Sequence, residues 1–496
     1  MQSKKEILGK TFFTLSIIFL IYLLITPLNH LICQIDEYFT LTITNLPVQD
    51  IITVTAGDVH PPLYYLMAKV VVEISKIFDL NVLFNLKLLN IVAFVLILII
   101  SITKIRKDYG WFTAGLFAFS ISIMSGFSRY YLIARMYIWA ALFIIIVFLA
   151  FKNIIYNKYD KKSWIIFTLF SVLAAYINYF AAITAICIYL ILLTYLIKNR
   201  KSEIKNWIVS VIVGIVLYLP WAFVVISQII KVKNDYWQPP LRLEEFIHFF
   251  GYYAYNTNLI LCTVSILFLV ILAIIFLKAS DNFSKKDQII ILGGFGTYIG
   301  FILIGILVCE IYRPILEAKH IIPAAAVLWL VLSIMLGKIK NKKLFLINLT
   351  VISLLLLSGI ANTVMTYDHD YHEGQLEKDY FTNIARDNNS ILIIATPNDI
   401  MFYLCCSTDI DTYCINVSDV FSLSSDELHR HYNYKDINGT QINELVLNNS
   451  DKNIYYMYFG KSPVNLPEEQ IITDYVMHYS KINTTNMTTN QKELHK

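Results

Sequence analysis

The sequence predicts a mainly α, polytopic membrane protein with a small α/β domain at its C-terminal end. Of its 496 residues, 57% are hydrophobic and only 15% are charged, whereas soluble domains carry about 25% charged residues. The charge is also divided, since residues 1–361 hold 31 Lys and Arg against 17 Asp and Glu, and residues 362–496 hold 9 against 19. We therefore expect a membrane domain over residues 1–361 and a separate soluble domain over 362–496.

Apolar runs long enough to cross a bilayer recur along the membrane domain. One shorter apolar segment, 63–78, is interrupted by Lys69, Glu73 and Lys76 and is expected to lie at the membrane surface as an interfacial helix. The alternative is that residues 63–78 form a span, which would change the number of expected spans. The eleven expected spans are about 11–32, 83–103, 111–127, 136–151, 163–180, 181–197, 207–226, 257–277, 287–309, 321–337 and 344–361.

Basic residues on alternate short loops set the expected orientation. Of the 40 Lys and Arg residues, 21 lie at the N-terminus or in the loops that follow every second span, and such loops are cytoplasmic in membrane proteins. With an odd number of spans, the N-terminus is then cytoplasmic and the C-terminal domain extracytoplasmic. The first span lacks a small-residue cleavage site and is expected to remain as an anchor. Because the positive charge lies where topology requires it, nucleic acid is not an expected partner.

The C-terminal domain changes from apolar runs to alternating elements. Residues 378–387 have a helical pattern, and residues 391–395 and 453–458 have the pattern of buried strands, which together indicate an α/β domain. A disulfide between Cys414 and either Cys405 or Cys406 is one reading of the cysteines, and three separate thiols is the other.

Three carboxylates and a histidine gather in the expected first outer loop. Asp36 and Glu37 follow the first span, and Asp58 and His60 precede two prolines. Ionised groups beside hydrocarbon are costly to desolvate, so the cluster favours chemistry, with a solvated acidic loop as the alternative. The same set can bind a divalent cation, but its spacing matches no fixed ligand pattern. No cofactor is therefore assigned, and metal dependence stays open.

Six strings carry a family resemblance: DEYFTLTI from Asp36, DVHPPLYYLMAKV from Asp58, SRYYLIARMYIWAALF from Ser128, YINYF from Tyr176, YLPW from Tyr218 and YRPILEAKHIIPA from Tyr312. In this order, over about residues 10–340, they resemble the membrane mannosyltransferase-like proteins of glycosyltransferase family 39. That family belongs to the GT-C superfamily, which includes protein O-mannosyltransferases and lipid A aminoarabinose transferases.

The resemblance implies a GT-C-type fold and an outward-facing active site. It implies a polyprenyl-phosphate-linked, mannose-like sugar as the donor, and an extracytoplasmic protein, lipid or glycan as the acceptor. In such enzymes the acidic pair of the first outer segment lies at the reaction centre, so Asp36 is the expected base. Glu37 is expected to orient the acceptor or bind a cation, and Asp58 and His60 are expected at the same site.

The departing phosphate needs cations, and aromatic side chains suit the sugar or the lipid groove. Arg135 lies in the family's ARMY-like string, but Ile133 and Ala134 stand where relatives often have an acidic residue, and Asn178 stands where a histidine often occurs. Headgroup-snorkelling cations and interfacial aromatic belts are the alternative readings. The expected phosphate-binding cations are Arg129, Arg135, Arg313 and Lys319, and the expected aromatic contacts are Tyr64, Tyr65 and Tyr179, with Tyr176, Tyr236 and Trp237 in the wider set.

Other function classes remain beside the glycosyltransferase. A lipid-linked sugar flippase would have internal repeats and charged residues in mid-membrane, and this sequence has neither, apart from Lys87 near a span end. A non-catalytic envelope-assembly protein would keep the fold without the chemistry. An oligosaccharyltransferase would carry a WWD-type string in its soluble domain, and here Trp237 has only Tyr236 beside it. The sequence identifies neither the sugar nor the acceptor.

Overall fold

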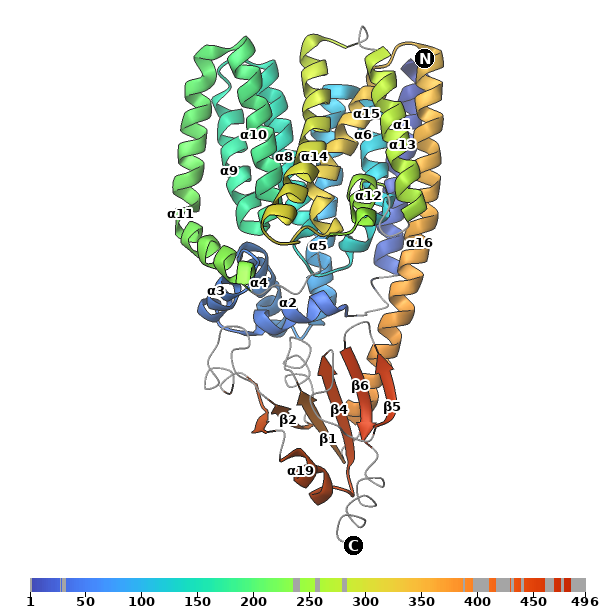
Figure 1. Cartoon of the computed structure of the whole chain (residues 1–496). Coiled ribbons are helices and arrows are strands. Elements are labelled where there is room, and N and C mark those ends of the chain that lie inside the picture. Colours follow the sequence, from blue (N-terminus) through green and yellow to red (C-terminus); the bar gives the residue numbers. More distant parts are fainter. Residues whose placement is uncertain are drawn as a thin grey trace. The chain divides into compact units, whose positions relative to one another are not determined.

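The chain forms two compact units in the computed structural model (Figure 1). The first contains residues 1–31 and 59–370, and the second contains residues 32–58 and 371–496. The expected domain boundary at residue 361 falls inside one long helix, α16 (Lys342–Arg386). The structure describes residues 2–26, 28, 33–234, 241–254, 259–278, 283–386, 389–395, 410–415, 429, 432–438, 441–459, 468–473 and 477–482.

Nine helices in the described part of the chain are long and apolar enough to cross a membrane. One of these stretches, 82–123, covers two expected spans because a π-helical turn joins α5 directly to α6. Helix α9, with 17 residues, is not among these nine. When α9 is included, each of the eleven expected spans overlaps a helix. The helices of the first unit are α1 (Gln2–Ile25), α4 (Leu63–Ile77), α5 (Val82–Ile100), α6 (Arg106–Ile123), α7 (Ser125–Ser128), α8 (Tyr137–Tyr156), α9 (Lys161–Ile177), α10 (Tyr179–Asn199), α11 (Ile204–Asn234), α12 (Leu243–Gly251), α13 (Leu259–Lys278), α14 (Lys285–Ile311), α15 (Ile322–Lys338) and the first part of α16.

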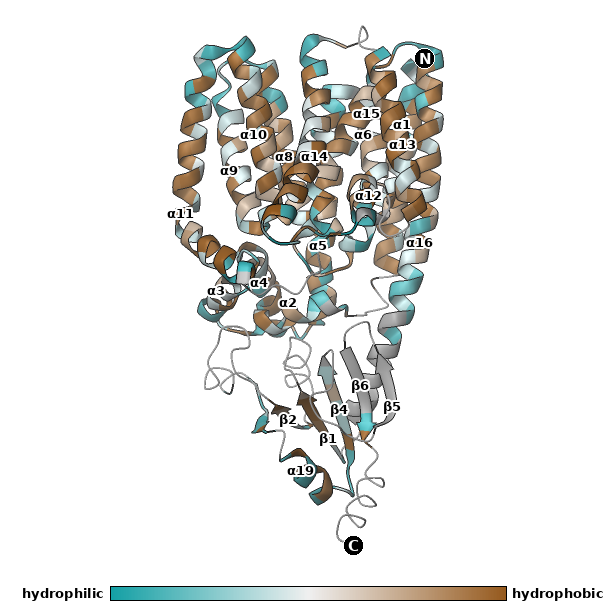
Figure 2. Ribbon diagram, in the orientation of Figure 1, coloured by the Kyte–Doolittle hydropathy of each residue, from teal (hydrophilic) through white to brown (hydrophobic). Residues whose placement is uncertain are grey.

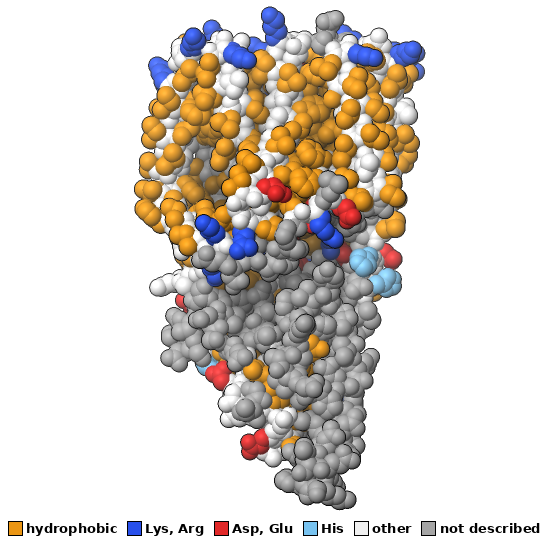
Figure 3. Space-filling model, viewed as in Figure 1, with side chains coloured by type: hydrophobic (Ala, Val, Ile, Leu, Met, Phe, Trp, Pro, Cys, Tyr) orange, Lys and Arg blue, Asp and Glu red, His pale blue; other side chains and the backbone are white. Residues whose placement is uncertain are grey.

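Helix α15 forms the centre of this bundle. Its apolar stretch is 94% buried, and it packs against α6, α8 and α14. Helix α11, in contrast, is only 11% buried. The bundle helices are apolar along their lengths (Figure 2), and apolar side chains dominate the side of the bundle seen in Figure 3, with Lys and Arg gathered at the end that holds the N-terminus. This is the surface of a multi-pass membrane protein, which lipid covers in the membrane.

Helix α1 lies in close backbone contact with α6. A Cβ added at Gly115 would overlap the carbonyl oxygen of Gly9, and a Cβ added at Gly9 would overlap the backbone of Trp111. Small residues allow membrane helices to approach in this way, and the contact replaces the hydrophobic driving force that lipid removes.

The expected start of the first span, residue 11, is wrong, because α1 begins at Gln2. The lysines that suggested a loop are inside the helix. The Nζ atom of Lys5 donates to the carbonyls of Gly337 (2.9 Å) and Ile339 (2.8 Å). These carbonyls, at the C-terminal end of α15, lack helical partners. The Lys5 ammonium group therefore finds hydrogen-bond acceptors in the protein while its backbone stays helical.

A group of side chains that we call the ion-pair cluster ties four helices together at the same end. It contains Asp108 on α6, Lys152 and Tyr156 on α8, Asp287 on α14 and Lys338 on α15. Lys152 pairs with Asp108, and Lys338 pairs with Asp287 at 2.7 Å. The hydroxyl of Tyr156 donates to the other oxygen of Asp287. Buried charges are expensive unless paired in this way.

The second unit contains α2 (Ile35–Asn45), α3 (Val48–Gly57), the end of α16, α19 (Ile442–Asn448) and a six-stranded sheet. The strand order is β3-β2-β1-β4-β6-β5, with β1 to β4 parallel and β5 and β6 antiparallel to their neighbours. The strands are β1 (Ser390–Ala395), β2 (Asp411–Ile415), β3 (Lys435–Ile437), β4 (Asn453–Phe459), β5 (Glu468–Thr473) and β6 (Met477–Ile482).

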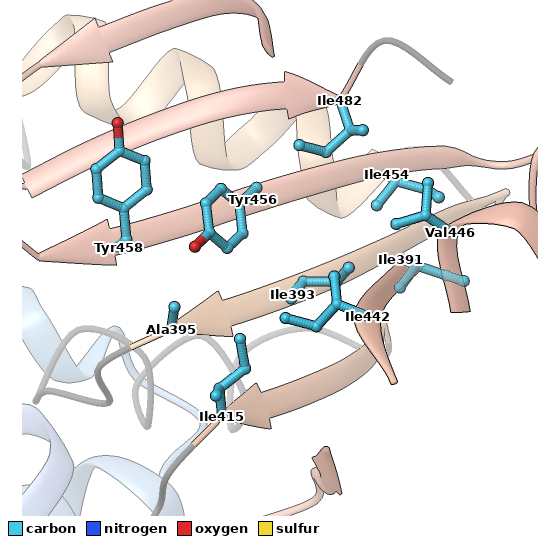
Figure 4. Close-up of a cluster of buried hydrophobic side chains, with 10 residues drawn as sticks. All are labelled: Ile391, Ile393, Ala395, Ile415, Ile442, Val446, Ile454, Tyr456, Tyr458 and Ile482. Carbon is cyan, nitrogen blue, oxygen red and sulfur yellow. The ribbon is translucent and has the colours of Figure 1, made fainter. Parts of the chain in front are cut away.

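One face of this sheet is covered by an apolar core. Ile393 of β1, Ile454 and Tyr456 of β4 and Ile442 of α19 pack together there (Figure 4). Both expected strands are confirmed, as β1 and β4. Residues 378–386 of the expected helix 378–387 are the last turns of α16. Cys405 and Cys406 lie outside the described residues, so the disulfide reading stays a prediction.

Candidate active site

The DxHPP string forms the passage from α3 into α4. Asp58 ends α3, and its backbone N–H donates to the carbonyl of Val54 at 2.9 Å. Two prolines then lead into α4, where a residue without an N–H is tolerated because the first turn leaves these groups unpaired. Tyr64 and Tyr65 lie in the first turn of α4 and are fully buried.

His60 and Arg135, 75 residues apart in the sequence, are in direct contact. The Nη2 atom of Arg135 lies 3.1 Å from Nε2 of His60. A guanidinium can only donate, so Nε2 accepts and the imidazole carries its proton on Nδ1. The Arg135 guanidinium also lies 5.8 Å from the ring centre of Tyr65, within cation–π range. The side chain of Arg135 is therefore buried against a neutral imidazole and an aromatic face.

The segment that carries Arg135 is irregular and buried. After a 3₁₀ turn at Arg129–Tyr131, residues 132–136 connect to α8 without regular structure. Buried carbonyls need donors, and two side chains of α5 supply them. Lys87 donates to the carbonyl of Leu132 at 2.6 Å, and Asn90 donates to the carbonyl of Arg135 at 2.9 Å. Helix α5 thus holds the segment in place.

We call His60, Tyr64, Tyr65, Asn90 and Arg135 the Arg135 cluster. Sequence analysis identified four of these residues and missed Asn90. A signal was present, because Asn90 and Lys87 are polar residues one helical turn apart in a mainly apolar helix, and polar residues inside spans are commonly functional.

Lys319 and His320 lie in a 3₁₀ turn, Ala318–Ile321, before α15. The Nζ atom of Lys319 is 3.1 Å from the carboxylate of Glu317 and 6.0 Å from the ring centre of Tyr137. His320 stacks on Phe180 at 3.9 Å, and its Nδ1 accepts the backbone N–H of Glu317. Because Tyr137 follows Arg135 by two residues, the turn brings a second cation to the start of α8.

The other two expected phosphate-binding cations have protein partners elsewhere in the first unit. Arg129 makes a bidentate contact with Asp370 on α16, with both distances 2.9 Å. Burial opposes the charged form of Arg129, but the Asp370 carboxylate more than offsets it, so the pKa of the guanidinium is raised. Arg313 donates from Nε to the carbonyl of Lys233 at the end of α11, at 2.9 Å.

The remaining aromatic candidates join helices. The hydroxyl of Tyr179 donates to Gln228 at 2.5 Å and accepts from Trp221 at 2.8 Å, which links α10 to α11. Asn178 caps α10 by accepting the N–H of Phe180 at 2.8 Å. Tyr236 and Trp237 lie outside the described residues.

Asp36 and Glu37 belong to the second unit, and the expectation that they lie in a loop is wrong. Both lie in the first turn of α2. An Oε atom of Glu37 accepts the backbone N–H of Gln34 at 2.9 Å, so this fully buried carboxylate caps the helix. Asp36 is only partly buried. No group of three or more His, Cys, Asp or Glu side chains is arranged to hold a metal ion within the part of the chain that the structure describes.

Comparisons with known proteins give a match in structure. In sequence, no protein-family model and no curated protein matches the chain. The fold is similar to that of ArnT from Cupriavidus metallidurans bound to undecaprenyl phosphate, with a TM-score of 0.59, 11% identity and coverage of 95% of this chain and 97% of that chain. For ArnT in the apo state the TM-score is 0.57 at 13% identity, with coverage of 95% and 98%. The chain thus has the fold of ArnT, a lipid A aminoarabinose transferase of the GT-C family, as the resemblance of its sequence strings implied.

Proposed function

We propose that this protein is a membrane glycosyltransferase that moves a sugar from a polyprenyl-phosphate-linked donor to an acceptor on the outer side of the membrane. The observation that carries the proposal is the buried contact of Arg135 with His60 and Tyr65, in a chain that matches the ArnT fold over 95% of its length. ArnT was crystallised with undecaprenyl phosphate, and a donor of that lipid class is the one we propose for this chain.

Arg135 is the proposed phosphate-binding residue. A guanidinium pairs with phosphate through two parallel hydrogen bonds, and the interaction is stronger in a buried site than in water. His60 holds the guanidinium without adding charge, and we assign it this positioning role. Lys319, whose Nζ lies 3.1 Å from the Glu317 carboxylate, is the second proposed phosphate-binding cation near the start of α8. Arg313 stays a candidate for the lipid headgroup, while the bidentate contact with Asp370 assigns Arg129 to holding α16.

The proposed reaction is a single displacement. The acceptor hydroxyl attacks the anomeric carbon of the sugar, and the bond between that carbon and the phosphate oxygen breaks. Polyprenyl phosphate leaves with the electron pair, and the hydroxyl proton passes to a base. Asp36 is the proposed base, because it matches the family's acidic position and, unlike Glu37, is not the residue whose carboxylate caps α2.

The deciding assay uses the purified full-length chain in detergent with an undecaprenyl-phosphate sugar and an extract of envelope acceptors. We expect polyprenyl phosphate to be released together with a glycosylated product, whose sugar and acceptor are then read by mass spectrometry. A flippase would move the donor across vesicle membranes without releasing lipid phosphate. An assembly protein would do neither, and either result would contradict the proposal.

The same assay tests Asp36. The Asp36→Asn substitution keeps the shape of the side chain and removes the proton acceptor, so turnover should fall by about 10²–10⁴-fold at unchanged protein abundance. The matched variant is Glu37→Gln, which is expected to lower the melting temperature by weakening the cap of α2. Near-normal turnover in Asp36→Asn would remove Asp36 from the mechanism.

A further inference from the structure

Asn90 is a fully buried amide in the apolar helix α5, and the proposed reaction gives it no chemical step. Its single NH₂ group lies against three backbone carbonyls, those of Tyr130 (3.4 Å), Ile133 and Arg135 (2.9 Å). Its Oδ1 atom accepts from the hydroxyl of Tyr64 at 3.3 Å. One side chain therefore contacts both segments that form the Arg135 cluster.

These contacts replace the hydrogen bonds that regular structure would supply. Residues 132–136 lie between a 3₁₀ turn and α8 and are buried, so their carbonyls cannot turn to water. The two N–H bonds of one amide are shared among three carbonyls, which fixes the path of the chain on both sides of Ile133. The conformation of the backbone at Arg135 consequently depends on a residue 45 positions earlier.

Only an amide of this length meets the requirements of the position. The carbonyls need a donor, and the Tyr64 hydroxyl needs an acceptor. A carboxylate would present oxygen to all three carbonyls, and an aliphatic side chain would satisfy neither side. An amide also carries no charge, so it holds the segment without attracting the guanidinium away from His60.

We propose that Asn90 is a positioning residue for donor binding: it sets the location of Arg135 through the carbonyls of residues 130–135, and it sets the start of α4, through Tyr64, relative to that segment. The inference rests on the proposed function, because it takes Arg135 as the group that holds the donor phosphate. Asn90 itself does not touch the donor.

The test compares two buried asparagines of the first unit. Asn90→Leu removes the donor and the acceptor at similar side-chain volume. The matched variant is Asn348→Leu in α16, where a fully buried amide donates to Leu344 of its own helix, at 2.7 Å.

Both proteins are purified at full length, and the measurements are the melting temperature and the Kd for undecaprenyl phosphate. We expect Asn90→Leu to raise the Kd by about 10- to 100-fold, the range expected from losing an aligned charged hydrogen bond. Asn348→Leu should leave the Kd unchanged.

A double-substitution cycle shows whether Asn90 acts through Arg135. If it does, Asn90→Leu adds little to the Kd of Arg135→Ala, because the group that it positions is already absent. Additive losses of affinity would overturn the proposal, as would an Asn90→Leu protein that binds as tightly as the wild type. A wild-type protein that does not bind undecaprenyl phosphate would instead contradict the proposed function, so the two failures are distinguishable.

If Asn90→Leu does not fold, Tyr64→Phe decides the question. It removes only the hydroxyl that donates to Asn90, and we expect a Kd raised by roughly 2- to 10-fold, the range for one neutral hydrogen bond. An unchanged Kd in Tyr64→Phe would overturn the proposal.

Discussion

Helix α8 has a polar group of residues at each end, and the two are held by different chemistry. Its C-terminal end carries Lys152 and Tyr156 of the ion-pair cluster, and its start follows Arg135 directly. With 20 residues, the helix separates the two groups by about 30 Å. At the first, opposite charges cancel each other across four helices. At the second, Lys87 and Asn90 of α5 donate to backbone carbonyls of the segment that carries Arg135.

The first group joins side chains of opposite charge on different helices, whereas the second joins side-chain donors to the backbone of one segment. The ion pairs of the first group join α6 to α8 and α14 to α15. A carrier that alternates its access would have to separate the helices at that end in each cycle, whereas a transferase that works from one side can keep them closed. The ion pairs thus fit the proposed transferase better than a carrier.

The largest effect is expected from two buried arginines near opposite ends of α8. Arg135→Ala should lower kcat/KM for the donor by about 10²–10³-fold, since a preorganised charge next to the leaving phosphate is lost. Arg200 instead donates to the carbonyls of Ile154 and Ile155, at 2.8 and 2.6 Å, so Arg200→Ala should lower the melting temperature at near-normal turnover. Equal losses of turnover in the two variants would break the comparison.

The ion-pair cluster gives the next effect, which is on stability. Asp287→Ala leaves the Lys338 ammonium and the Tyr156 hydroxyl without their acceptor, and breaking a buried pair costs about 3–5 kcal/mol. We expect a clear fall in melting temperature with an unchanged Kd for undecaprenyl phosphate. Asp160→Ala, which removes only the cap of α9, should cost about 1 kcal/mol. A weakened Kd in Asp287→Ala would show that the two ends of α8 are coupled.

The smallest effect sharpens the assignment of Arg129. Its side chain is 29% exposed and that of Asp370 is 12% exposed, so a cycle of Arg129→Gln and Asp370→Asn should give a coupling of about 1–2 kcal/mol in stability. Donor affinity should change less than twofold in all three variants. A tenfold weaker Kd in Arg129→Gln alone would return Arg129 to the phosphate site.

Apolar runs predicted the spans because a bilayer fixes the length and composition of a crossing helix, and the sequence strings predicted the GT-C-type fold. Polarity misled the prediction at α2, because the acidic pair Asp36 and Glu37 suggested a loop. Glu37 instead caps the helix by accepting the backbone N–H of Gln34. The prediction failed at the start of α1 because Lys5 finds carbonyl partners within the protein.

The contact between His60 and Arg135 follows from two strings that the resemblance had already singled out. Asn90 could not be predicted in the same way. Its partners are carbonyls of a segment about 40 residues later, and backbone carbonyls are identical in every sequence. Only the three-dimensional path of residues 130–135 shows that these carbonyls need a donor, so a polar residue in an apolar helix gave a signal without a function.

The close contact of α1 with α6 has a consequence for the order of events during synthesis. Helix α1 is synthesised before α6, and its Gly9 face matches that helix, which starts about 80 residues after α1 ends; at 5–20 residues per second this interval is on the order of ten seconds. During that interval the glycine face of α1 meets lipid or the insertion machinery in place of Gly115. A side chain larger than glycine at either position would therefore act at the assembly step, and its effect would appear as degraded nascent protein more than as altered activity of the protein that survives.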